Sequence, residues 1–368
     1  MKRTLYSTTL VLLAVAANAD PFTAGDLAVL QVGDGSAGLT SGSTALFIDE
    51  FTTSGTFVQR IAIPAAGGTA LTESGTASSE GALTLSSDRS VLTFAGYAAS
   101  PGIAGIASTA AATYSRGVGV INASGAYSRV ATGSSAFDGN NVRSAVSDGQ
   151  NYWLAGTASA TANSGIWCST AGGVPVQVSS GNFRNANIAN GNLQVSTGSA
   201  PWGLNSFSGL PTGTATSSQW LTMTAGNPSP YDFAVSPDGT FAYLADDRSG
   251  KTYGGIERWN FNAGTWTMAY NLAPGTTAND GMRQFTVDFS GAHPVIYGTT
   301  VEGSANRLVE VTDAGAGSAF TLLATAPANE VYRGVDFTPT QVPEPSPLVL
   351  IGLGSLLLVS RRSSAKRP

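Results

Sequence analysis

The sequence predicts an all-β protein, a β-propeller of six blades, and three observations carry this prediction. Only 11% of the 368 residues are charged and 45 are glycine, so helix-forming side chains are scarce. A strand–turn–strand cassette recurs along the chain, and two further strand-like runs follow each copy. The copies return at the interval of roughly 40–50 residues that is typical of four-stranded propeller blades.

The clearest copy of the cassette is Tyr231–Asp247, with the sequence YDFAVSPDGTFAYLADD. An apolar run from Phe233 reaches a Ser-Pro-Asp-Gly turn, and a second run, Phe241–Ala245, returns from it. Asp-Gly between two β-rich runs indicates a hairpin, because glycine adopts the positive φ that such a turn needs. Weaker copies pair Gly81–Ser86 with Val91–Gly96, Ser144–Ser147 with Tyr152–Gly156, Asn185–Ala189 with Leu193–Thr197, and Gln284–Phe289 with Val295–Thr300.

Third and fourth runs complete each unit. They are Gly117–Asn122 with Tyr127–Ala131, Gly165–Ser169 with Val174–Val178, Trp202–Phe207 with Ser218–Met223, Gly255–Asn260 with Thr265–Leu272, and Arg307–Thr312 with Ala319–Ala324. The long first interval carries an insertion, Ala98–Ser115, that is expected to be a loop.

The two ends of this region complement each other. The opening runs, Leu27–Val32, Thr44–Glu50 and Thr56–Ile63, lack a first strand, whereas Tyr332–Thr338 matches only the first strand of a cassette. Pairing Tyr332–Thr338 beside Leu27–Val32 would complete one blade and remove two exposed sheet edges. This closure predicts six blades, with five or seven blades, or a β-sandwich pair, as the alternatives.

The layout of Leu27–Thr338 and its Ser-Pro-Asp-Gly turn resemble secreted propellers of the lactonase and NHL type. The resemblance implies a propeller and leaves the activity open, since propellers carry many functions.

Residues 1–19 have the pattern of a secretory signal peptide. Lys2 and Arg3 precede the apolar run Leu10–Ala16, and Ala17-Asn18-Ala19 has the A-x-A form of a cleavage site. Cleavage after Ala19 would leave residues 20–340 as the propeller domain.

Residues 341–368 have the pattern of a sorting tail. Val342-Pro343-Glu344-Pro345 precedes an apolar run, predicted as a transmembrane helix over residues 347–360, and a basic cluster follows it. This order resembles the PEP-CTERM signal of Gram-negative exported proteins. The resemblance implies recognition by the membrane protease exosortase and a bacterium with an exopolysaccharide matrix. The protein would be anchored in the inner membrane before processing, and would then reach the cell surface or extracellular matrix.

Charge and residue counts exclude several functions. Without the six basic residues near the two ends, 12 basic residues face 23 acidic ones, a balance that opposes nonspecific nucleic-acid binding. His293 is the only histidine and Cys168 the only cysteine, so a metal cluster with several histidines and an intrachain disulfide are impossible. These absences favour a noncatalytic protein over an enzyme, and they predict no cofactor.

Calcium is the one cofactor that the loops could hold. Asp138, Asp280 and Glu330 fall in loops that lead into blades, and such oxygen-rich loops can hold Ca²⁺. Ordinary turns have the same composition. Nearby asparagines are Asn140, Asn141, Asn182 and Asn279.

Aligning the cassettes places four arginines at one equivalent position of the first strands, at one mouth of the central channel. They are Arg143, Arg184, Arg283 and Arg333, with Glu80 and Tyr231 at the same position of the other two copies. Converging guanidiniums repel one another unless a carboxylate or other anion lies among them, so this position predicts an anion-accepting pocket, for acidic sugars of a matrix for example. The alternative is that the arginines bond to carbonyls of neighbouring blades, or pair with Glu80, Asp280 and Glu330, and so only join the blades together.

Three functional classes remain from the sequence. The favoured one is a surface or matrix protein whose propeller binds a glycan, peptide or protein. The others are a lactonase-like hydrolase or lyase with a carboxylate-bound metal, and a purely structural envelope component.

Overall fold

The Ser-Pro-Asp-Gly turn closes a hairpin, as its sequence predicts. It connects β18 (Pro230–Val235) to β19 (Phe241–Asp246), and Gly239 adopts a φ of 70°. The Asp238 carboxylate accepts hydrogen bonds from the Thr240 amide and the Ser236 hydroxyl, which fix the turn. β20 (Gly255–Asn262) and β21 (Thr265–Leu272) add to β19 in order and complete a four-stranded antiparallel blade.

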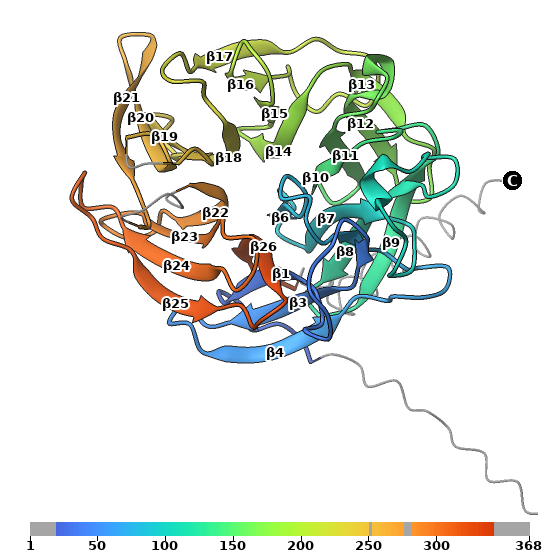
Figure 1. Cartoon of the computed structure of the whole chain (residues 1–368). Helices are drawn as coiled ribbons and strands as arrows, with labels where there is room; N and C mark the ends of the chain where they lie inside the picture. The colour runs from blue at the N-terminus through green and yellow to red at the C-terminus, as the bar shows by residue number, and fades with distance from the viewer. Residues whose placement is uncertain (1–19, 250–251, 276–280, 342–368) are drawn as a thin grey trace, which may run out of the picture.

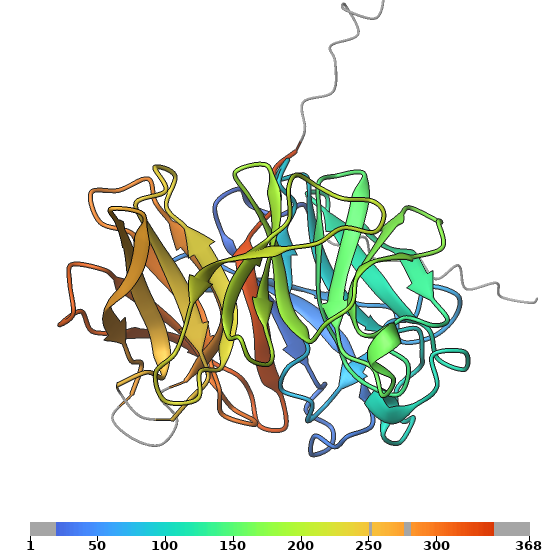
Figure 2. The same ribbon diagram turned by 90° about the horizontal axis from the view of Figure 1, so that it is seen from above.

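The computed structural model describes residues 20–249, 252–275 and 281–341, which form a six-bladed β-propeller (Figure 1). The predicted all-β fold and blade number are therefore confirmed. The inner strands contact one another in a ring around the central channel, and the connecting loops gather at the two faces (Figures 1 and 2). Four other blades have their four strands in chain order from the inside outward. Along the chain, the first two of these blades are β6 (Leu83–Leu85), β7 (Val91–Tyr97), β8 (Arg116–Asn122) and β9 (Tyr127–Gly133), and then β10 (Val142–Ser147), β11 (Asn151–Gly156), β12 (Gly165–Thr170) and β13 (Val176–Ser179). The other two are β14 (Phe183–Ala189), β15 (Asn192–Thr197), β16 (Gly203–Ser206) and β17 (Ser218–Thr222), and then β22 (Met282–Asp288), β23 (Val295–Thr300), β24 (Arg307–Thr312) and β25 (Thr321–Thr325).

The last strand of the propeller closes the first blade. β26 (Val331–Phe337) pairs antiparallel with β1 (Leu27–Val32), from Leu27 opposite Phe337 to Val32 opposite Val331. β3 (Leu46–Phe51) and β4 (Phe57–Ala62) complete this sheet in the order β26-β1-β3-β4. The expected closure by a C-terminal strand is confirmed.

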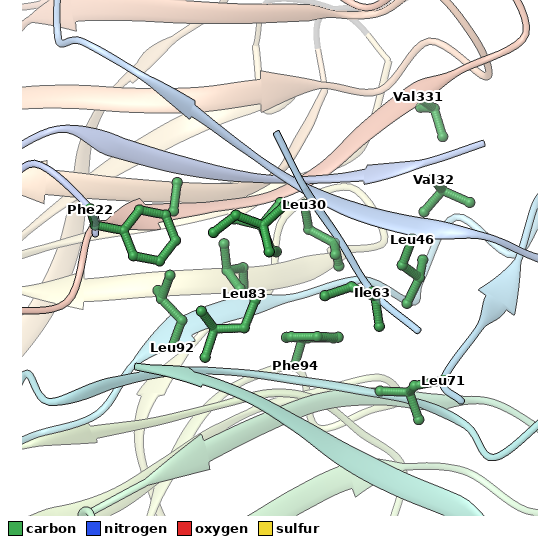
Figure 3. Packing of buried hydrophobic residues seen from close by; sticks show 14 residues of the cluster. Phe22, Leu30, Val32, Leu46, Ile63, Leu71, Leu83, Leu92, Phe94 and Val331 are labelled. Atoms are coloured by element: carbon green, nitrogen blue, oxygen red, sulfur yellow. The ribbon is translucent and has the colours of Figure 1, made fainter. Parts of the chain in front are cut away.

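The blades pack through apolar side chains that alternate along the strands. Between the first two blades, Leu30, Leu46, Leu83 and Phe94 are each no more than 1% exposed and lie in one cluster (Figure 3). Burying side chains of this size stabilises the fold by roughly 1.5–3 kcal/mol each.

Polar side chains join the inner strands into a closed ring. Six hydrogen bonds connect the six neighbouring pairs, each with a side chain as donor or acceptor. They run from Thr84 Oγ1 to Ala145 O, Ser144 Oγ to Arg184 O, Asn187 Nδ2 to Phe233 O, Phe285 N to Asp232 Oδ2, Thr286 Oγ1 to Asp336 Oδ1, and Leu85 N to Asp336 Oδ2.

Several features differ from the sequence expectation or lie beyond it. The Ala98–Ser115 insertion contains the 3-10 helix η1 (Ile106–Ser108), a second 3-10 helix is η2 (Thr161–Asn163), and β2 (Ser43–Thr44) pairs with β5 (Glu73–Ser74) in a small sheet. Within the described ranges, no helix is long and apolar enough to cross a bilayer. The predicted signal peptide with its cleavage residue Ala19, the sorting motif and the helix over residues 347–360 all lie outside those ranges.

Candidate functional site

Local irregularities of the inner strands place the predicted arginines at one mouth of the channel. Five inner strands change register near their first residues, so that extra residues of the inner strand stand opposite the second strand. The shifts fall at Arg143, at Arg184-Asn185, at Tyr231-Asp232, at Arg283 and at Arg333-Gly334. A β-bulge redirects side chains out of the regular alternation. We call the channel end that holds Arg143, Arg184, Tyr231, Arg283 and Arg333 the arginine mouth.

Tyr231 lies among the guanidiniums. Arg184 Cζ is 4.2 Å and Arg283 Cζ is 5.4 Å from the centroid of the Tyr231 ring. Both distances are within the range of a cation–π interaction. The aromatic ring thus shields the positive charges of two blades from each other.

Arg143 and Arg184 contact the next blade without a carboxylate partner. Nη1 of Arg143 donates to Asn182 Oδ1 at 2.7 Å and to the Phe183 carbonyl at 3.0 Å. Nη1 of Arg184 donates to Ser229 Oγ at 2.7 Å and to the Pro230 carbonyl at 3.1 Å. Burial, with the charge of Arg184 as a further cause, lowers the pKa of Arg143 to about 10.

The other two arginines have acidic neighbours. Arg283 forms an ion pair with Asp247, with Nη2 and Oδ2 2.8 Å apart. Arg333 donates from Nη1 to the Ala77 carbonyl and from Nη2 to the Gly75 carbonyl, and lies close to Glu73 and Glu80. Each arginine therefore also joins two segments of the ring, as the alternative interpretation of these residues expects.

Glu80 does not occupy the position that the cassette alignment gives it. Leu83 pairs with Phe94 as Ala145 pairs with Leu154, and Arg143 stands two residues before Ala145. The equivalent position is therefore Gly81, with a φ of 89°, where a Cβ atom would lie 2.5 Å from Arg333 Cβ. Only glycine permits this close approach of the two inner strands.

Glu80 is instead buried between blades. Its carboxylate accepts hydrogen bonds from the Tyr97 hydroxyl, Asn141 Nδ2 and the Ser74 amide. Burial raises the pKa of Glu80, against the effect of these three hydrogen bonds. Burial and the charge of Glu80 raise the pKa of Glu73 well above its ordinary value. Neither carboxylate oxygen of Glu73 accepts a hydrogen bond from a described residue.

A small cavity opens beside Arg283 and Arg333. Its volume is about 100 Å³, and Gln284, Thr299, Thr300 and Glu302 also line it. The cavity therefore has room for several water-sized polar groups, and the Glu80 carboxylate also lines it.

In the described part of the chain, only two of the four arginines of the arginine mouth have acidic neighbours close by. Asp247 neutralises Arg283, and Glu73 and Glu80 lie beside Arg333. Arg143 and Arg184 have no carboxylate within bonding distance in the part of the chain that the structure describes, and their Nη2 atoms donate no hydrogen bond there. Two neighbouring guanidiniums with free donors favour an anion between them.

The described residues of the loops proposed for calcium contact other groups of the protein. Asp138 Oδ1 accepts a hydrogen bond from the Ala111 amide at 2.6 Å. Glu330 Oε2 lies 3.6 Å from Arg60 Nη2, which makes an ion pair. Asn182 binds Arg143 and Asn141 binds Glu80, whereas Asn279 and Asp280 lie outside the described residues. Among the described residues, no group of three or more acidic, histidine or cysteine side chains could hold a metal ion.

Comparisons with known proteins give structural similarities at low sequence identity. No protein-family model and no curated protein sequence matches the chain. A 6-phosphogluconolactonase-like protein of Bacteroides uniformis is similar in structure, with a TM-score of 0.49, 14% identity and 83% of each chain covered. The periplasmic gluconolactonase of Pseudomonas aeruginosa gives a TM-score of 0.48 and 15% identity over 80% of this chain and 82% of that one. A chain of a nidogen/laminin complex gives 0.47 and 10% identity over 86% of this chain and all of that one.

Proposed function

We propose that this protein is a noncatalytic binding propeller that takes an anionic ligand, such as an acidic sugar of an extracellular matrix, at the arginine mouth. The observation that carries the proposal is the pair Arg143 and Arg184, which are neighbours and share no carboxylate among the described residues. Burial and the charge of Arg184 oppose the charged form of Arg143, and Glu80 offsets them only from beyond bonding distance, so a counter-charge placed at the pair would be stabilising. An anionic ligand supplies that counter-charge.

The shape of the mouth favours a carboxylate on a larger polar body. The cavity beside Arg283 and Arg333 is small, and the Asn185–Gln284 amide pair lies next to the arginines. A ligand would place its acidic group at the guanidiniums and keep its remaining atoms in the open mouth. Uronic acids and sulfated sugars have this form.

Export and sorting form the second part of the proposal. The signal-peptide pattern of residues 1–19 supports secretion, and the order Pro343-Glu344-Pro345, apolar run and basic cluster supports processing by exosortase. A protein sorted in this way would meet acidic polysaccharide outside the cell. The partners would then be exosortase, followed by matrix polysaccharide or an envelope protein.

Calorimetric titration of galacturonate and of sulfate into the protein tests the binding site. We expect saturable binding that weakens as salt is added, because added ions screen the guanidiniums. Arg143→Gln and Arg184→Gln should each weaken it about tenfold or more, since a hydrogen bond to a charged group contributes about 1.5–3 kcal/mol.

Two controls separate binding from folding. Arg129 also donates to backbone carbonyls, those of Ala70 and Gly68 at 2.6 Å, so Arg129→Gln should leave affinity unchanged. Any response to galactose, which has no carboxylate, should not depend on Arg143 or Arg184. A large loss of thermal stability in the mouth variants, with no anion bound by the wild type, would show that these arginines only join the blades.

A further inference from the structure

The two features that stand out most in the sequence lie at one cavity away from the arginine mouth. The Ser-Pro-Asp-Gly turn follows β18, and His293, the only histidine, lies in the turn between β22 and β23. Both turns are at the opposite ends of the inner strands from Tyr231 and Arg283. Between them lies a cavity of about 350 Å³, lined by Asp238, Phe241, Arg258, Phe289, His293 and Asp313, among others.

A guanidinium is held rigidly at this cavity. Arg258 Cζ lies 3.9 Å from the centroid of the Phe241 ring, and Nη1 donates to Asp313 Oδ2 at 2.7 Å. Asp313 is 3% exposed and also accepts hydrogen bonds from the hydroxyls of Tyr243 and Tyr270. Nη2 of Arg258 donates to no described residue, so it is the free donor of the cluster.

Aromatic rings form the apolar part of the cavity. Phe289 packs on Phe241, with centroids 6.0 Å apart, and is stacked on Tyr243 at an interplanar angle of 22°. Phe241 and Phe289 are partly exposed. Aromatic walls with a few fixed polar groups are typical of small-molecule sites, and the volume lies at the small end of that class.

We propose that this cavity binds an uncharged, hydroxyl-rich ring, the chemistry of a neutral sugar unit. Such a ring has an apolar face for the phenyl groups, and its hydroxyls both accept from Arg258 Nη2 and donate to the Asp238 carboxylate. An anion is disfavoured, because Asp313 neutralises Arg258 and Asp238 leaves the lining negative. A wholly apolar molecule would remove water from Arg258 without replacing its hydrogen bonds.

The single histidine gives a local probe of this cavity. Methyl glycosides of glucose, galactose and mannose are added in turn to isotopically labelled protein, and the imidazole NMR signals of His293 are followed. At least one glycoside should shift these signals in a saturable way. Arg258→Gln and Phe289→Leu should weaken that binding about tenfold, the loss expected when one hydrogen bond or ring contact is removed.

If Arg258→Gln disturbs the Asp313 cluster, the variant Asp238→Asn still tests the proposed sugar site. Asp238 is on the exposed turn, so its replacement should weaken the glycoside without unfolding the protein. Arg143→Gln is the matched control and should leave these shifts unchanged. The proposal is overturned if no glycoside shifts the His293 signals, if Asp238→Asn binds as the wild type does, or if galacturonate binds here more tightly than the glycosides.

Discussion

Asn185 and Gln284 contact each other across the central channel through their side-chain amides. Asn185 Nδ2 donates to Gln284 Oε1 at 3.1 Å, and Gln284 Nε2 donates to Asn185 Oδ1 at 3.2 Å. Each side chain lies next to its strand's arginine in sequence, and both are at most 4% exposed. The pair therefore connects two inner strands that are not neighbours in the ring, next to the arginine mouth.

Removing one side of this amide pair should destabilise the fold. Asn185→Ala or Gln284→Ala leaves a buried amide without its partner, at a cost of about 1–3 kcal/mol. The double variant should cost clearly less than the sum of the two, because both partners are then absent. Urea unfolding of the four proteins measures the coupling, and strictly additive losses would contradict a direct interaction.

The closing strand should be essential, and the residues beyond it should not. Deletion from Tyr332 onward exposes the edge of β1 and leaves Leu27 and Val29 without their packing partners. Several buried side chains at about 1.5–3 kcal/mol each approach the whole stability of a typical domain. Truncation after Thr340, which keeps the bond from its amide to the Arg89 carbonyl, should fold normally. Equal melting temperatures for the two proteins would refute closure by β26.

Asp232 should make the fold less stable as the pH rises. Burial raises the pKa of Asp232 to about 7, against hydrogen bonds from the Phe233 and Phe285 amides. Its unfolded pKa is about 3.9, so the folded state binds more protons between about pH 4 and 7. Stability from this group is fully present below about pH 4 and falls by up to about 1.4 kcal/mol per pH unit as the pH rises to 7.

Melting temperatures measured between pH 4 and 7 test this. The slope should become less steep in Asp232→Asn, and the remainder is expected from other buried carboxylates such as Glu257, whose pKa burial also raises to about 7. It should be unchanged in Asp238→Asn, whose carboxylate is on the exposed turn. An unchanged slope in Asp232→Asn would exclude Asp232 as its source.

The tail should direct the protein to its destination. In a host that carries exosortase, replacing Glu344 or deleting Leu348–Val359 should alter the cellular fraction in which the protein is found, because the motif and apolar run are proposed to form one signal. Fractionation and intact mass measure the effect. If both variants keep the location and mass of the wild type, the sorting proposal fails.

Local chemistry explains why the strands could be predicted and parts of the site could not. Turn residues such as Asp238-Gly239 determine hairpins within a few positions, and the unpaired first and last runs indicated the closure. The bulges at Arg143 and Arg283 left the cassette alignment intact, so these residues could be assigned to one mouth. The cassette alignment put Glu80 at the arginine position, one residue away from the true equivalent, Gly81. Gly81 has no side chain, so the sequence offered nothing to align there.

Contacts between residues far apart in the chain could not be predicted from a single sequence. Asn185 and Gln284 are 99 residues apart, and nothing local distinguishes them from other strand amides. Arg258 and Asp313 likewise meet only after two blades pack together. Charge balance around such residues depends on three-dimensional neighbours, and therefore could be judged only from the structure.

Anomalous diffraction from crystals grown in selenate is the most direct test of the arginine mouth. We expect a selenium peak between Arg143 and Arg184, placed so that selenate oxygens lie about 2.7–3.2 Å from Nη2 of both residues. Galacturonate added to the same crystals should displace it, and Arg143→Gln crystals should lack it. Selenate bound elsewhere in crystals whose mouth is open to solvent, with none beside Arg143 and Arg184, would contradict an anion-binding mouth.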